Sequence, residues 1–99
     1  MATNKNASIR YRALDKCFRD YRHRYFIEDL IDKCEEELES FNFTANVSRR
    51  QIFDDIRFME SEAGWSIPLD RLKEGKRTYY RYYDKDFTIN EQPLTDEEA

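Results

Sequence analysis

The chain has 99 residues, enough for a single domain, since domains usually hold about 100–150 residues. Charged residues make up 38 % of it and the mean hydropathy is −0.99, values that on their own point to disorder. Aromatic residues make up 15 %, however, and the net charge is only −4, so we expect a folded domain with a polar surface. No apolar run approaches the roughly 18 residues of a membrane span, and no apolar signal segment opens the chain. We therefore expect no membrane association and a cytoplasmic location.

The two cysteines and the one histidine bear on redox and metal chemistry. Without an export signal, Cys17 and Cys34 are expected to be reduced, half-buried thiols. Together with His23 they are too few for a structural zinc site, which usually takes four nitrogen or sulfur ligands. We expect neither a metal nor another cofactor.

Charge is distributed unevenly along the chain. Residues 1–26 contain seven basic and two acidic side chains, whereas residues 27–46 contain one basic and seven acidic side chains. Residues 47–83 are again slightly basic, with eight basic and six acidic side chains, and residues 84–99 are acidic. The isoelectric point of about 5.1 therefore does not exclude a polyanionic partner, but a local basic patch has to bind it.

Three segments have the apolar spacing of amphipathic helices. The first runs from about Ala7 to Arg19, with Asn6 as its N-cap. The second begins at Ile27 and has its acidic residues between the apolar positions 27, 30, 31, 34, 38 and 41. Residues 25–27 are either a short strand before this helix or the run into it.

The third helix opens with Ser48 as its N-cap. Four apolar residues then repeat along one face: Ile52, Ile56, Met59 and Ala63. Gly64 is well placed as the residue just beyond the helix end, which predicts a helix roughly 24 Å long.

After Gly64 the apolar period changes from helical to alternating. Trp65, Ile67 and Leu69 predict an edge strand, because Pro68 cannot lie in a central one. Residues 73–76 are a turn signal, and residues 77–83 are rich in tyrosine and other β-forming residues. Together these segments predict a hairpin, with a short extended piece around residues 87–89 beyond it.

The order of helix, short extended piece, helix, helix and hairpin is that of a three-helix winged helix-turn-helix domain. The predicted fold class is therefore mainly α with a small β-hairpin. In this layout the N-terminal residues of the third helix face base edges in the major groove of DNA, and the hairpin, or wing, lies along the neighbouring backbone.

Several segments also resemble a known family. Residues 25–31, the run Val47-Ser48-Arg49-Arg50 with its continuation to Ile56, residues 64–69 and the hairpin are similar to DeoR-like bacterial regulators. The nearest resemblance is to the N-terminal DNA-binding domain of WYL-domain transcriptional regulators, and it covers nearly the whole chain. It implies sequence-specific binding of double-stranded DNA in transcription regulation. In such regulators an effector would bind a C-terminal WYL domain, and the full-length protein would form a homodimer.

This resemblance divides the chain into a winged helix domain at 1–90 and an acidic linker at 91–99. Thr95 and Glu98 have the spacing of a capping box, which indicates the start of a truncated helix leading to a missing C-terminal domain. An ordinary acidic tail is the alternative. No sustained heptad repeat is present, so we expect the isolated chain to be monomeric or weakly associated.

The candidate DNA-contacting residues come from two elements. With the apolar stripe of the third helix facing inward, its opposite face and its start present seven of them: Ser48, Arg49, Arg50, Gln51, Phe53, Asp54 and Arg57. The hairpin tip adds Lys73, Lys76 and Arg77. Arginine can bond guanine and glutamine can bond adenine through two hydrogen bonds each. Alternatively, Asp54 pairs with Arg50 and Arg57 and merely neutralises them.

The remaining polar and aromatic residues are open to two interpretations. The basic residues of the first helix and the following loop either contact the DNA backbone or pair with the acidic second helix. They are expected on the solvent side: Arg10, Arg12, Lys16, Arg19, Arg22 and Arg24. At least two tyrosines of the hairpin are expected to cover the core.

No enzyme signature is present: the sequence contains no glycine-rich phosphate loop, no nucleophile elbow and no cysteine–histidine pair at useful spacing. We therefore expect no enzyme. The alternative function is that of a winged helix protein–protein interaction module. Such a module would dock through the acidic face of the second helix, at Glu35, Glu36, Glu37 and Glu39.

Overall fold

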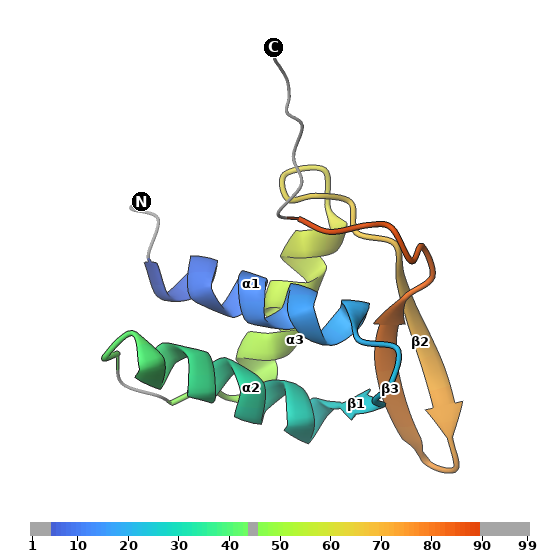
Figure 1. The fold of residues 1–99 in the computed structure, drawn as a ribbon, viewed down its shortest axis with the longest axis horizontal. Helices are drawn as coiled ribbons and strands as arrows, with labels where there is room; N and C mark the ends of the chain where they lie inside the picture. Colours follow the sequence, from blue (N-terminus) through green and yellow to red (C-terminus); the bar gives the residue numbers. More distant parts are fainter. Residues whose placement is uncertain (1–4, 44–45, 90–99) are drawn as a thin grey trace.

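The computed structural model describes residues 5–43 and 46–89, which form three helices and a three-stranded antiparallel sheet (Figure 1). The elements follow one another as α1 (Lys5–Arg19), β1 (Tyr25–Phe26), α2 (Ile27–Ser40), α3 (Arg49–Glu60), β2 (Leu69–Glu74) and β3 (Arg77–Tyr82). The predicted fold class, a mainly α winged helix-turn-helix with a β-hairpin, is confirmed. The predicted linker at 91–99 and its capping box lie outside the described residues.

The three helices pack together on one side of the sheet. In Figure 1, α1 and α2 run antiparallel, α3 crosses behind them, and the β2–β3 hairpin projects beyond the helices at the lower right. The strand order is β1-β3-β2, so the two residues of β1 pair with the middle of β3. Because β1 leads directly into α2, this pairing fixes the start of α2 beside the hairpin.

The core lies between the helices and the inner face of the sheet. The most deeply buried apolar and aromatic side chains come from all three helices and from β3: Leu14, Phe18, Leu30, Cys34, Leu38, Ile52, Ile56, Met59 and Tyr82. The inward faces predicted for the helices are thus confirmed over most of their length, but Phe41, predicted as the last apolar position of α2, lies beyond the helix and is 54 % exposed. The prediction for the hairpin is also confirmed, since Tyr80 and Tyr82 are both buried.

A buried ion pair joins α1 to α3. Arg10 donates from Nε and Nη2 to the two carboxylate oxygens of Asp55, at 2.6 and 3.1 Å. The Arg10 side chain is 10 % exposed and that of Asp55 is 3 % exposed. The expectation that all the basic residues of the first helix face solvent is therefore wrong for Arg10. The apolar stripe does not reveal this, because the partner lies 45 residues away in sequence.

A second buried carboxylate ties α1 to the end of the domain. Asp15 is fully buried and accepts hydrogen bonds from the Tyr82 hydroxyl at 2.7 Å, the Thr88 hydroxyl at 2.8 Å and the Ile89 amide at 3.2 Å. The segment after β3 thus turns back over α1 (Figure 1). Residues 87–89, where a short extended piece is expected, form no strand, and Ile89 is buried.

The third helix is shorter than predicted: it ends at Glu60, whereas the predicted helix continues to the residue before Gly64. The Ser61 hydroxyl donates to the carbonyl of Phe58 at 2.6 Å, and the amides of Trp65 and Ile67 donate to the carbonyl of Met59. The chain therefore folds back over the last helical turn, and Ala63 is exposed instead of continuing the apolar face. Gly64 lies inside this turn, where a Cβ atom would come within 2.3 Å of the Phe58 carbonyl oxygen.

The hairpin also begins later than predicted. Leu69 is the first residue of β2, whereas Trp65 and Ile67 belong to the turn after α3. Their alternating apolar pattern reflects contacts with the core and not a strand, since Ile67 is buried and Trp65 lies edge-on to the ring of Tyr11. The hairpin turn is confined to Gly75 and the residue after it, and the φ of +64° at Gly75 favours glycine.

Two further expectations for α1 and α2 need correction. Asn6 lies inside α1, which begins at Lys5, so it is not the N-cap. Cys17 and Cys34 are free thiols as expected, but they are fully buried instead of half-buried. Burial raises the pKa of Cys17 to about 12, so this thiol stays protonated at neutral pH.

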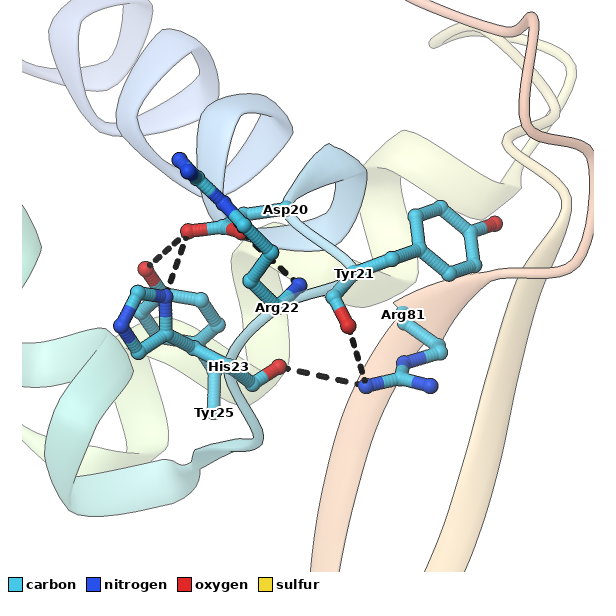
Figure 2. Close-up of polar contacts among 6 residues, drawn as sticks. All are labelled: Asp20, Tyr21, Arg22, His23, Tyr25 and Arg81. Atoms are coloured by element: carbon cyan, nitrogen blue, oxygen red, sulfur yellow. Dashed lines mark hydrogen bonds and ion pairs between the residues drawn. The ribbon is translucent and has the colours of Figure 1, made fainter.

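The loop between α1 and β1 is organised by Asp20 (Figure 2). Its carboxylate contacts Nδ1 of His23 at 2.8 Å and accepts from the amide of Arg22 and the hydroxyl of Tyr25, both at 3.0 Å. Arg81 of β3 donates to the carbonyls at positions 21 and 23, which joins the loop to the sheet. The hydrogen bond with His23, followed by that from the Arg22 amide, lowers the pKa of Asp20 to about 2.

We expect Asp55→Ala to lower the free energy of unfolding by about 3–5 kcal/mol, because it leaves the guanidinium of Arg10 buried without its partner. Urea unfolding followed by circular dichroism measures this. Asp54→Ala, which removes an exposed carboxylate on the same helix, is the control and should cost no more than about 0.5 kcal/mol. Equal losses in the two variants would contradict the structural role of the ion pair.

We also expect the pKa of Asp20 to rise from about 2 toward its ordinary value when His23 is replaced by alanine. A lowered pKa in the folded state stabilises the fold above the unfolded-state pKa near 4, and this stabilisation is lost as the pH falls toward 2. The measurement is an NMR titration of the Asp20 carboxyl carbon. Arg22→Ala keeps the backbone donor and should move the pKa less; an unchanged pKa in His23→Ala would refute the assignment.

Candidate nucleic-acid interface

The outward face of α3 is as the sequence predicts. Because Ile52, Ile56 and Met59 are buried against the other elements, the opposite face is exposed to solvent. This face carries four of the candidate residues: Arg50, Phe53, Asp54 and Arg57. Phe53 is 39 % exposed and adds an apolar side chain to this charged face.

The charged residues of this face do not neutralise one another. Among the described residues, Arg50, Asp54 and Arg57 form no hydrogen bond or ion pair. The predicted pairing of Asp54 with the two arginines is therefore absent from the structure. Both guanidinium groups keep all their donors free for an external acceptor.

The start of α3 is tied to the rest of the domain. Ser48 is the N-cap, as predicted, and its hydroxyl accepts from the Gln51 amide at 3.1 Å. The side-chain nitrogen of Gln51 donates to Asp55 at 3.1 Å, so one of its two N–H donors is already used inside the domain. Arg49 donates from Nη1 to Glu28 at the start of α2, at 3.2 Å.

The tip of the hairpin exposes three cations: Lys73, Lys76 and Arg77. The guanidinium of Arg77 lies over the ring of Phe26, 3.7 Å from its centroid, and its Nη2 lies 3.8 Å from Oε1 of Glu28. Stacking of this kind restricts an arginine side chain without consuming its N–H donors. Arg77 is thus directed toward the start of α2 and α3.

A groove of about 350 Å³ lies between the hairpin and the starts of α2 and α3. Its lining includes Arg49, Lys76 and Arg77 together with Glu28, Phe26 and Phe53. Three cations against one carboxylate, at the N-terminal end of a helix, form an environment that favours an anion such as a backbone phosphate. The structure brings together four of the candidates in this groove: Arg49, Phe53, Lys76 and Arg77. The other six lie outside its lining: Ser48, Arg50, Gln51, Asp54, Arg57 and Lys73.

Sequence reasoning missed Phe26 and Glu28. Glu28 is one of seven acidic residues in its segment, and nothing in the local pattern distinguishes it from the others. The pairing of Phe26 with Tyr79 across β1 and β3 is what carries both residues to the hairpin. The signal that could have identified these two residues is the junction between β1 and α2. Because β1 has only two residues, the first turn of α2 lies beside β3, the strand with which β1 pairs.

The basic residues of the first helix and loop have partners on several elements. Lys16 pairs with Glu37 of α2 at 3.4 Å, but Arg19 pairs with Asp15 at 4.0 Å within α1. Arg24 reaches the wing, at 3.7 Å from Glu74, and Arg10 pairs with α3. Only one of these ion pairs therefore involves α2.

The acidic face of α2 is partly used inside the domain. Glu35 accepts from the amide of Val47 at 3.1 Å, which supports the connector before α3. Glu37 pairs with Lys16, and both Glu35 and Glu37 are half-buried. Of the four residues proposed for protein docking, only Glu36 and Glu39 are exposed, and Glu36 pairs with Lys33 at 3.6 Å.

The described part of the chain offers neither a metal site nor a membrane span. Within residues 5–43 and 46–89, no group of three or more histidine, cysteine, aspartate or glutamate side chains could hold a metal ion. In the same ranges, no helix is both long enough and apolar enough to cross a membrane.

Comparison with models of protein families gives a match over most of the chain. The model of the N-terminal winged helix domain of WYL domain-containing proteins matches residues 6–83. Neither the curated proteins nor the solved structures include a match to this chain. The matched range takes in all three helices and the sheet except the first residue of α1, and it includes every candidate residue of α3 and the hairpin. The chain therefore belongs to the family of N-terminal winged helix domains found in WYL domain-containing proteins.

Proposed function

We propose that this domain binds double-stranded DNA in a sequence-specific manner, as the N-terminal domain of a bacterial transcriptional regulator. The observation that carries the proposal is the exposed face of α3, where Arg50 and Arg57 have no partner among the described residues, next to a groove lined by three cations. A helix with free arginines on its outer face beside a basic hairpin suits the major groove and the adjacent backbone.

Base readout is assigned to α3. Arg50 lies in the first turn of α3, the end of the helix that would enter the major groove of DNA. Its guanidinium, with free donors, can bond O6 and N7 of guanine. Asp54, one turn further on, can accept from N4 of cytosine, and Phe53 can contact a thymine methyl group. These roles explain why an acid and an aromatic ring are exposed on a surface that binds a polyanion.

Backbone contacts are assigned to the hairpin and the groove. Lys73, Lys76 and Arg77 lie near the hairpin turn, on side chains that can reach phosphates but not base edges in the major groove occupied by α3. Ser48 contributes from the start of α3, where the helix dipole also favours a phosphate.

The family suggests the rest of the regulator. A WYL domain would bind an effector, and a homodimer would place two copies of α3 on two half-sites of the operator. Such a protein would act in the cytoplasm. The alternative, docking of a protein partner on the acidic face of α2, has weaker support because Glu35 and Glu37 already contact residues of this domain.

A binding assay with the full chain tests the proposal. Selection from a pool of randomised duplexes identifies an operator, and fluorescence anisotropy at several salt concentrations then measures the affinity for that operator and for a mixed-sequence duplex. Each phosphate contact should contribute about 0.9 to the slope of log K against log salt. A slope near zero would refute DNA binding and leave the protein-docking alternative.

Arg50→Ala should weaken binding to the operator by about 1–3 kcal/mol and binding to the mixed-sequence duplex much less, because Arg50 reads a base. Lys76→Ala combined with Arg77→Ala should weaken binding to both duplexes alike and lower the salt slope by about one for each phosphate that is no longer neutralised. Both variants are compared with wild type at one salt concentration by fluorescence anisotropy, and the hairpin variant also across the salt series.

Lys85→Ala is the charge-matched control for Arg50→Ala, since Lys85 is exposed after β3 and belongs neither to α3 nor to the groove lining. If Arg50→Ala weakens both duplexes equally, Arg50 contacts a phosphate and the reading role passes to Arg49, Gln51 or Arg57. If neither the Arg50 variant nor the hairpin variant changes binding, the chosen surface is not the DNA surface.

A further inference from the structure

Glu28 links the two parts of the candidate interface. Its Oε2 accepts from Nη1 of Arg49 at 3.2 Å, and its Oε1 lies 3.8 Å from Nη2 of Arg77. One carboxylate therefore contacts the first residue of α3 and the first residue of β3, each through a different oxygen. Glu28 is itself the second residue of α2, where the positive end of the helix dipole stabilises a carboxylate.

The contact leaves Arg49 able to read a base. A guanidinium presents five N–H donors on two edges, and Glu28 takes a single donor on Nη1. The other edge, formed by Nε and Nη2, makes no hydrogen bond with the described residues. That edge has the paired-donor geometry that matches O6 and N7 of guanine.

Glu28 also limits where the Arg49 side chain can point. Both side chains are about 60 % exposed, so the ion pair by itself contributes little to the stability of the fold. Without it, Arg49 at the rim of the groove could swing to the nearest phosphate on any sequence. Holding an arginine in one orientation before binding lowers the entropy lost when it pairs with the correct base.

We propose that Glu28 is a specificity-determining residue of the DNA surface, which orients Arg49 toward a base edge and withholds it from nonspecific phosphate contacts. This inference rests on the proposed DNA binding. It assigns to Glu28 a positioning role, because the carboxylate acts through Arg49 and does not itself contact the DNA.

The test compares Glu28→Ala with Asp32→Ala in the full chain. Asp32 is a suitable control because it lies on the same helix, is exposed, has no hydrogen bond or ion pair among the described residues, and is outside the groove lining. Both variants change the net charge equally. The quantity measured is the ratio of the affinity for the selected operator to the affinity for a mixed-sequence duplex, by fluorescence anisotropy at one salt concentration.

We expect Glu28→Ala to lower this ratio about tenfold, a loss within the range that one guanine contact provides. Part of the loss should come from tighter binding to the mixed-sequence duplex, because the freed Arg49 can then reach a phosphate. Asp32→Ala should leave the ratio unchanged. Glu28→Gln keeps an acceptor for Arg49 and should retain part of the ratio.

A double-mutant cycle with Arg49→Ala separates positioning from a general charge effect. In the Arg49→Ala background, Glu28→Ala should not lower the ratio further. The inference is overturned if Glu28→Ala leaves the ratio unchanged, tightens both duplexes equally, or lowers the ratio to the same extent without Arg49. If the wild-type chain itself does not distinguish the two duplexes, the proposed function fails and the role of Glu28 with it.

Discussion

The position of α3 depends on the buried ion pair between Arg10 and Asp55. Two hydrogen bonds fix one side of α3 to α1, and the same carboxylate also accepts from Gln51 in the first turn of α3. A charged pair this deeply buried is tolerated only with good geometry, because the desolvation of both groups is costly. The ion pair therefore fixes the rotation of α3 about its own axis more strictly than apolar packing alone, which tolerates small shifts of the packed side chains.

That rotation decides which residues face outward. With Asp55 directed at α1, Arg50, Asp54 and Arg57 face solvent, since they lie on the opposite side of the helix. The hairpin is positioned independently of the ion pair, because β1 pairs with β3 and leads into α2. Glu28 contacts both elements, through Arg49 of α3 and Arg77 of the hairpin. The candidate interface is thus a consequence of one internal ion pair and one short strand.

The sequence predicts those parts of the fold that depend on local pattern. The inward stripes of the helices, the cap at Ser48 and the outward face of α3 follow from spacing and from side-chain chemistry within a few residues. The end of α3 was missed because Gly64 suits both a helix terminus and a chain crossing over the last turn. Buried Arg10 and the contacts of Glu28 were also missed, since they join residues 45, 21 and 49 positions apart, which no local periodicity records.

The three hydrogen bonds on Asp15 have a consequence for how the domain folds. Their donors come from residues 67 to 74 positions later in the chain, so the carboxylate can be buried at low cost only after the last strand and the segment behind it have arrived. Pairing of α1 with α2 is local by comparison and can precede this step. Because the Asp15 side chain of α1 is shielded from water only when the far end of the domain closes on it, the helices and the sheet should unfold together in one cooperative transition.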